Sequence, residues 1–161
     1  MYPTPTFENK IVNSSTLATR LAELPRPLVF TNGCFDVLHR GHVTYLAQAR
    51  ALGASLIVGV NSDASVKRQG KGDDRPINAE QDRLAVLAAL ESVSLVILFD
   101  EDTPLNLVLA CHPDKLVKGG DWQPEKIVGA SEVLNWGGSV HSIPFLHERS
   151  TTALLKKIRS L

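Results

Sequence analysis

Short continuous apolar runs alternate along the chain with longer stretches in which apolar residues recur every three or four positions. Continuous apolar runs predict strands that are buried on both faces. Apolar residues that recur every three or four positions predict amphipathic helices. The predicted strands are residues 28–32, 55–61, 95–99, 115–120 and 139–145. The predicted helices are residues 13–24, 42–52, 78–90, 103–112, 131–138 and 150–161.

Residues at the ends of these segments support the predicted helix boundaries. Asn78, with Gln81 three residues later, has the spacing of a capping box. Thr103 followed by Pro104 is typical of a helix start. Gly53 is expected to end the helix over residues 42–52.

Strand and helix alternate about five times, which predicts a doubly wound, Rossmann-like α/β fold: a five-stranded parallel sheet with helices on both faces. We expect residues 1–25 to form an N-terminal arm and a short helix, with residues 1–13 as a loose arm, before a domain over residues 26–161. Such sheets bind ligands at the carboxyl ends of their strands, near the point where the strand order reverses. The functional residues are therefore expected in the segments that follow the strands: 31–42, 61–76, 100–103, 118–122 and 146–152.

Composition narrows the possible functions. The 161 residues suffice for one domain, and 17 basic residues balance 17 acidic ones, which argues against a protein that coats nucleic acid or anionic lipid. Cys34 and Cys111 fit no metal-ligand spacing and are expected to be free thiols in a reducing compartment. The N-terminal residues lack the pattern of a signal peptide, and no apolar run has the length to cross a bilayer, so we expect a cytoplasmic protein.

The segment TNGCFDVLHRGH, residues 31–42, carries the most distinctive chemistry. His39 and His42 flank Gly41 at a predicted helix start, where unpaired N–H groups and the positive end of the helix dipole favour a phosphate. These histidines have two alternative interpretations. If the histidines were plain surface or cap residues, the His-x-Gly-His motif at a strand-to-helix junction would be unexplained. A metal pair would need more ligands, and neither a cysteine nor a third histidine follows within reach in the sequence. We therefore interpret this segment as a phosphate site.

The same residues resemble a known superfamily. GCFDVLHRGH is similar to the nucleotidyltransferases with the His-x-Gly-His signature, the cytidylyltransferase-like superfamily. Within it, VNSDASVKR, GDDRPIN, LVKGGDW and STTALLKKI resemble the adenylyltransferases that act on D-glycero-β-D-manno-heptose 1-phosphate. The resemblance covers residues 26–161. In some bacteria that activity is fused to a sugar kinase. For this chain the resemblance therefore implies a separate sugar kinase that acts earlier in the same pathway.

The resemblance implies that AMP passes from ATP, with Mg²⁺, to a heptose 1-phosphate, giving the ADP-heptose of lipopolysaccharide core synthesis. It implies three catalytic residues: His39, His42 and Lys67. The implied nucleotide-binding residues are Thr31, Asn32, Gly33, Cys34, Phe35, Gly41, Arg83, Gly119, Gly120, Asp121, Ser150, Thr151 and Thr152. The implied sugar-phosphate contacts are Asp36, Asp63, Lys71, Arg75 and Trp122.

Simpler interpretations stay open for several of these residues. Asp36 is alternatively a turn residue, Arg83 a surface arginine, and residues 61–76 a solvated charged loop. Cys34 is interpreted as a packing residue, because the implied chemistry needs no protein nucleophile. Related cytidylyltransferases carry an arginine near the position of Phe145, and the sequence does not decide whether Arg149 takes its place.

Three other functions are alternatives to this one. The nearest is a cytidylyltransferase for glycerol 3-phosphate or another small phosphate ester, and the residues alone do not separate ATP from CTP. A non-catalytic nucleotide-binding module is disfavoured because both histidines are present, and a nucleic-acid-binding domain is disfavoured by the zero net charge. From the resemblance to single-domain relatives we expect a homodimer that binds small molecules, without nucleic acid or membrane as partner.

Overall fold

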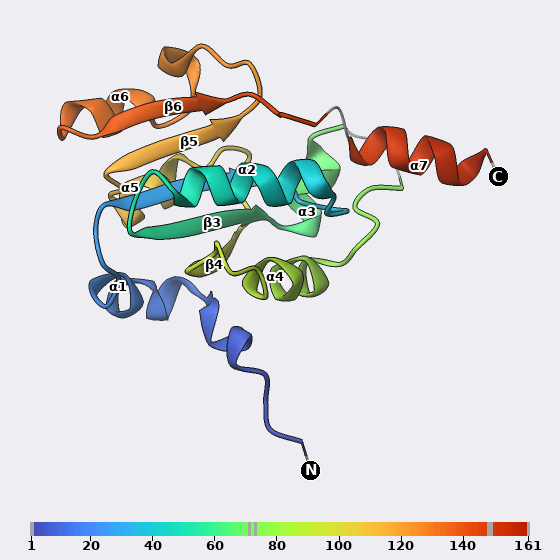
Figure 1. The fold of residues 1–161 in the computed structure, drawn as a ribbon, viewed down its shortest axis with the longest axis horizontal. Coiled ribbons are helices and arrows are strands. Elements are labelled where there is room, and N and C mark those ends of the chain that lie inside the picture. The colour runs from blue at the N-terminus through green and yellow to red at the C-terminus, as the bar shows by residue number, and fades with distance from the viewer. Residues whose placement is uncertain (1, 71, 73, 148–149, 161) are drawn as a thin grey trace.

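Six parallel strands form one sheet at the centre of the molecule (Figure 1). The computed structural model describes residues 2–70, 72, 74–147 and 150–160. The strand order is β1-β4-β3-β2-β5-β6. The bounds are β1 (Ile11–Val12), β2 (Leu28–Gly33), β3 (Ser55–Asn61), β4 (Leu95–Phe99), β5 (Lys115–Gly119) and β6 (Ser139–Ile143).

Helices cover both faces of this sheet. One face packs against α1 (Ser14–Ala22), α5 (Leu105–Cys111) and α6 (Ala130–Asn135). The opposite face packs against α2 (Arg40–Arg50) and α4 (Glu80–Ala88). Two further helices, α3 (Asp63–Arg68) and α7 (Thr151–Arg159), lie at the carboxyl ends of the strands (Figure 1). Short 3₁₀ turns occupy Thr6–Lys10 and Pro124–Lys126.

The two faces explain why the strands are continuously apolar. Side chains alternate along a strand, so neighbouring residues enter different layers of the core. Phe30 and Ile57 pack in the layer with α1, α5 and α6, whereas Val29 and Val58 pack in the layer with α2 and α4. All four are fully buried. The predicted Rossmann-like parallel sheet with helices on both faces is confirmed.

The number of strands differs from the prediction. The expected five strands and six helices are all present, with ends shifted by a few residues, but the sheet has a sixth strand, β1. Ile11 and Val12 pair with Val96 and Ile97, so the prediction of a loose arm is wrong for these two residues. A two-residue strand is too short to produce a recognisable period, which is why the sequence did not indicate it.

Two predicted caps are also wrong. The N-cap of α4 is Ala79, and Asn78 instead donates its backbone N–H and its side-chain amide to Asp36. The N-cap of α5 is Pro104, one residue after the predicted Thr103. Ser150 does cap α7, since its hydroxyl accepts a hydrogen bond from the N–H of Ala153 at 3.0 Å. At Asn78, the hydrogen bonds to Asp36 therefore take the place of the helix cap that the local sequence pattern predicts.

The strand order reverses beside β2, between β2 and β5. From β2 the chain builds outward through β3 and β4, then crosses to β5 and β6 on the other side. The carboxyl ends of β2 and β5 therefore lie next to each other at the reversal, which is where such sheets bind ligands. Among the described helices, none combines the length and apolar composition needed to span a bilayer.

We predict that Leu87→Ala lowers the free energy of unfolding by about 2–5 kcal/mol, because it leaves a cavity in the layer between α4 and the sheet. Leu87 is fully buried, whereas the adjacent Val86 is 51% exposed on the same helix. Urea denaturation of both alanine variants measures the difference. Equal losses for Leu87→Ala and Val86→Ala would contradict this packing of α4.

Candidate active site

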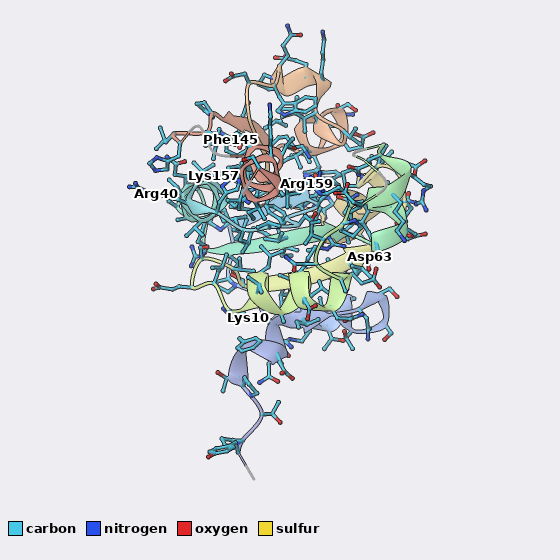
Figure 2. All side chains as sticks on the ribbon, turned by 90° about the vertical axis from the view of Figure 1, so that its right-hand side faces the viewer. Lys10, Arg40, Asp63, Phe145, Lys157 and Arg159 are labelled. Carbon is cyan, nitrogen blue, oxygen red and sulfur yellow. The ribbon has the colours of Figure 1, made fainter. Side chains whose placement is uncertain are left out.

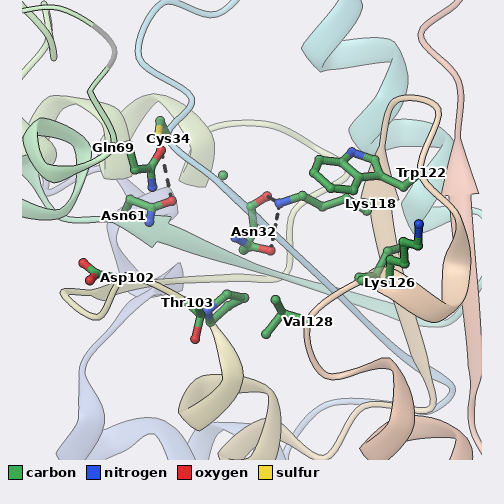
Figure 3. A pocket seen from close by; sticks show the side chains of 13 residues that line it. Asn32, Cys34, Asn61, Gln69, Asp102, Thr103, Lys118, Trp122, Lys126 and Val128 are labelled. Atoms are coloured by element: carbon green, nitrogen blue, oxygen red, sulfur yellow. Dashed lines mark hydrogen bonds between the residues drawn. The ribbon is translucent and has the colours of Figure 1, made fainter.

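Two neighbouring cavities open at the carboxyl ends of β2 and β5. We call the first the histidine cavity; its volume is about 420 Å³ and its lining is Asn32, Gly33, Cys34, Phe35, Asp36, His42, Tyr45, Arg75, Lys118, Gly119, Phe145, Thr151 and Thr152. We call the second the Trp122 cavity (Figure 3); its volume is about 230 Å³ and its lining is Asn32, Gly33, Cys34, Asn61, Gln69, Asp102, Thr103, Pro104, Lys118, Trp122, Lys126, Ile127 and Val128. Four residues line both cavities: Asn32, Gly33, Cys34 and Lys118.

The turn that leaves β2 separates the cavities. Phe35 adopts a positive φ of 47°, a left-handed conformation that is unfavourable for an aromatic residue and that bends the chain sharply. Its ring packs under Gly33, where an added Cβ would lie 3.0 Å from the ring. The strain and the close packing together fix the path of the Asn32–Cys34 backbone between the two cavities.

The two histidines of the motif lie together, as expected. His39 is the N-cap residue of α2, and its ring stacks on that of His42 with centroids 3.9 Å apart. Gly41 leaves room for this stack, because a Cβ there would lie 3.0 Å from the His39 ring. His42 lines the histidine cavity, while His39 stands behind it.

His42 is held in its neutral form. Burial lowers its pKa from 6.5 to about 4, and the neighbouring His39 adds to the shift. The Nδ1 atom of His42 is buried with no hydrogen-bond partner among the described residues. A buried polar atom of this kind is usually paired when water or a ligand is present. An anion in the cavity would favour the protonated ring and raise this pKa.

Asp36 fixes the segment that precedes α4. Its carboxylate accepts hydrogen bonds from Nε of Arg75 at 2.5 Å and from the N–H groups of Ile77 and Asn78 at 2.8 and 2.9 Å. Burial raises the pKa of Asp36, but the N–H groups of Asn78 and Ile77 and the Arg75 guanidinium outweigh burial, so the pKa lies below its usual value. This carboxylate is therefore engaged by the protein itself.

Arg83 is buried beneath the site. Only 2% of the residue is exposed, and its guanidinium donates to the carbonyl oxygens of Cys34 at 2.6 Å and Asn61 at 2.8 Å and to Asp63 at 2.8 Å. The surface-arginine alternative is therefore wrong. Arg83 joins the turn after β2 to the end of β3, which makes it a positioning residue. Asp63 is engaged by this ion pair.

The start of α7 closes one side of the histidine cavity. Thr151 and Thr152 line the cavity, and the Thr151 hydroxyl also donates to the carbonyl oxygen of Val37 at 3.1 Å. Ser150 is used as the helix cap. Figure 2 looks onto this edge, with α7 projecting toward the viewer near Phe145.

The end of β5 contributes less to the histidine cavity than expected. The ring of Phe145 covers Gly119, where a Cβ would lie 2.8 Å from that ring. Gly120 has a φ of 109° and carries the turn to Trp122, whose indole N–H donates to the carbonyl of Gly119 at 3.1 Å. Trp122 lines only the second cavity, and Asp121 is exposed and not among the described lining residues of either.

Other expected residues are not brought to the described cavities. Lys67 is exposed on α3 and absent from both described linings. Thr31 is fully buried, and its hydroxyl pairs with that of Tyr45 at 2.5 Å below the cavity. Lys71 and Arg149 lie outside the described residues, so their predicted roles stay predictions.

Several lining residues were not named individually in the sequence analysis, although most of them lie in the segments 61–76, 100–103 and 118–122 where functional residues are expected. Lys118 is the most important, and a lysine inside an otherwise apolar strand was the available signal. Tyr45 was hidden in the apolar face of a helix, and the others come from segments distant in sequence: Asn61, Gln69, Asp102 and Thr103. As expected, neither Cys34 nor Cys111 forms a disulfide among the described residues. Cys34 nevertheless faces both cavities.

The comparisons with known proteins agree with this geometry. A family model described as Cytidylyltransferase-like matches residues 30–153, which include both histidines and both described cavities. This chain belongs to the cytidylyltransferase-like family. Members of this family are nucleotidyltransferases.

Two curated relatives illustrate what this cytidylyltransferase-like chain resembles. A Bordetella bronchiseptica protein named D-beta-D-heptose 1-phosphate adenylyltransferase is 57% identical over 155 residues, which are 95% of this chain and 96% of that protein. The Bifunctional protein HldE of Geotalea uraniireducens is 50% identical over 97% of this chain but only 32% of its own length. The chain therefore corresponds to about a third of the bifunctional protein.

Solved structures share the cytidylyltransferase-like fold. A lipopolysaccharide core biosynthesis protein from Thermoplasma volcanium has a TM-score of 0.61 and 31% identity, covering 76% of this chain and 98% of that one. Pantothenate synthetase from Thermus thermophilus has a TM-score of 0.61 at 18% identity, covering 91% of this chain and 70% of that one. The second likeness concerns the fold alone.

We predict that His42 titrates with a midpoint near pH 4 in the free protein and that inorganic triphosphate raises this midpoint. Since an unfolded histidine titrates near pH 6.5, the shift also makes the folded state less stable as the pH falls from 6.5 toward 4. The Cε1–H signal in NMR spectra, assigned by its loss in His42→Ala, measures both midpoints. A midpoint of 6.5 unaffected by triphosphate would contradict the buried, phosphate-facing ring.

Proposed function

We propose that this chain transfers AMP from ATP to D-glycero-β-D-manno-heptose 1-phosphate, giving ADP-heptose and pyrophosphate. The observation that carries the proposal is the stacked histidine pair at the start of α2, with His42 in a cavity that adjoins a second one across the Asn32–Cys34 segment. The name and 57% identity of the Bordetella relative support this substrate. Its product would serve as a precursor of the lipopolysaccharide core.

The two cavities suit two substrates. The histidine cavity offers His42, Arg75, Thr151 and Thr152, which are groups that bind phosphates, so it takes the nucleotide. The Trp122 cavity offers amides, a carboxylate and a hydroxyl together with an indole, a combination that suits a sugar with many hydroxyls. Asp102 can accept hydrogen bonds from those hydroxyls and Thr103 can both donate and accept, although one oxygen of Asp102 already accepts from Nε of Arg68 at 2.8 Å.

In the proposed reaction an oxygen of the sugar phosphate attacks the α-phosphorus of ATP. A new P–O bond forms, the bond from the α-phosphorus to the bridging oxygen breaks, and pyrophosphate leaves with the electron pair. The attacking phosphate oxygen is already anionic, so no residue has to remove a proton. The residues of the site align the two substrates and stabilise the negative charge that develops at the α-phosphorus.

The described residues contain no group of three or more potential ligands that could hold a metal ion. The described His, Cys, Asp and Glu side chains therefore do not by themselves supply a set of three ligands for Mg²⁺. We propose that Mg²⁺ arrives with ATP, because this ion commonly binds to substrate phosphates and retains several waters.

A second candidate is a cytidylyltransferase acting on glycerol 3-phosphate or another small phosphate ester; the description of the matching family model, Cytidylyltransferase-like, supports a cytidylyltransferase but names no acceptor. We also infer, from the resemblance to single-domain relatives, that the chain forms a homodimer, and we propose separately that it acts in the cytoplasm. A separate kinase would supply the sugar 1-phosphate, consistent with the bifunctional proteins of which this chain matches about a third.

Purified protein with Mg²⁺ should release pyrophosphate from ATP only when heptose 1-phosphate is present, with at least tenfold lower rates for CTP. A panel of four NTPs against the β and α anomers of heptose 1-phosphate and glycerol 3-phosphate measures this preference. Activity confined to CTP with glycerol 3-phosphate would establish the second candidate instead. No release with any pair would contradict both.

His42→Ala should lower turnover by about 100- to 1,000-fold, because it removes a donor to the phosphates in the transition state. The fold should be retained, as judged by circular dichroism. His141→Ala is the matched control, since His141 lies on β6 outside the described cavity linings. Turnover within threefold of the unaltered protein would remove His42 from the mechanism.

A further inference from the structure

Lys118 has a distinctive position at the reversal of strand order. It lies near the end of β5, and its amine donates to Asn32 on the neighbouring β2, to the side-chain oxygen at 3.2 Å and to the carbonyl oxygen at 3.4 Å. Figure 3 shows the side chain extending across to Asn32 beside Trp122. The amine therefore bridges the two strands whose ends separate the cavities.

Lys118 is also the only charged side chain among the described residues that line both cavities. The other three shared residues are Asn32, Gly33 and Cys34, which are uncharged amide, backbone and thiol groups. Arg75 faces only the histidine cavity and is paired with Asp36, while Lys126 faces only the Trp122 cavity. Positive charge at the junction therefore comes from Lys118.

The junction is where the reaction has to occur if each cavity holds one substrate. An attacking oxygen must come within about 3–3.5 Å of the phosphorus before the bond forms. Two phosphates that approach so closely repel each other, and the five-coordinate transition state concentrates further negative charge between them. A cation placed at that point reduces the repulsion between the two phosphates. It stabilises the transition state more than it stabilises either substrate in its bound state.

We propose that Lys118 contacts the α-phosphate of the nucleotide and the phosphate of the acceptor together, and so serves as a catalytic cation at the point of transfer. This inference rests on the proposed function. Lys118 keeps its proton throughout, because the acceptor oxygen supplies the electron pair of the new bond and pyrophosphate removes that of the broken bond. Its hydrogen bonds to Asn32 hold the amine in place between the substrates.

The first test compares Lys118→Met, Lys118→Arg and the control Lys115→Met in steady-state assays with ATP and heptose 1-phosphate. Lys115 lies on the same strand outside the described linings of the two cavities. We expect kcat to fall at least 100-fold in Lys118→Met with less than a fivefold change in either KM. Lys118→Arg should retain at least tenfold more activity than Lys118→Met, and Lys115→Met should match the unaltered protein.

Three results would overturn the assignment: normal kcat in Lys118→Met, equal loss in the methionine and arginine variants, or an effect limited to the KM of one substrate. Activity of the unaltered protein in the same assay tests the proposed function separately. If it releases no pyrophosphate with ATP and heptose 1-phosphate, the proposed function fails; if it does and Lys118→Met is equally active, only the inference fails.

A second measurement does not depend on the folding of a variant. Reductive methylation of the unaltered protein, mapped by mass spectrometry, reports the accessibility of each lysine amine. Lys118 should be protected at least fivefold by a non-hydrolysable ATP analogue alone and by heptose 1-phosphate alone, while Lys115 should be unaffected by either. Protection of Lys118 by one substrate only, or by neither, would contradict contact with both phosphates.

Discussion

The parallel direction of all six strands is the constraint on which the site depends. Because every strand ends at the same edge, the polar residues that follow β2, β3 and β5 meet there although they are far apart in sequence. Helices cover both faces of the sheet, so the interior of each strand is apolar and chemistry is restricted to this edge. At the reversal of order the chain leaves β2 for α2 on one face and β5 for α6 on the other, and the two adjoining cavities open above these neighbouring strand ends.

Buried charges hold this edge in one conformation. Arg83 ties the turn after β2 to β3, and Asp36 ties the same turn to the segment before α4. A buried guanidinium or carboxylate is costly unless it is fully hydrogen-bonded, so both networks resist rearrangement of the loop they hold. The strained backbone of Phe35 persists within the same framework. Catalysis by electrostatic stabilisation benefits from such rigidity, because the donors need not reorganise when charge develops.

The sequence predicted those parts of the structure that have a local cause. Strands at 28–32 and 55–61 were evident from continuous apolar runs, and the histidine motif was evident from its position before a helix. The sixth strand and α3 were missed because two apolar residues or six mixed ones carry too weak a period. The partners of Arg83 and Asp36 were also out of reach, since Arg83 bonds to Cys34 and Asp36 to Asn78, 49 and 42 residues away. The position of Lys118 beside Asn32 depends on the pairing of β2 with β5, which the sequence did not indicate.

The central claim is that the two substrates lie on opposite sides of the Asn32–Cys34 segment and meet at its edge. A crystal structure with a non-hydrolysable ATP analogue and heptose 1-phosphate tests this claim most directly. We expect the triphosphate to lie against His42 and the start of α7, and the sugar to lie between Asp102 and Trp122. The α-phosphorus should face the acceptor phosphate beside Asn32. A triphosphate bound in the Trp122 cavity, or both substrates bound on one side of the segment, would contradict it.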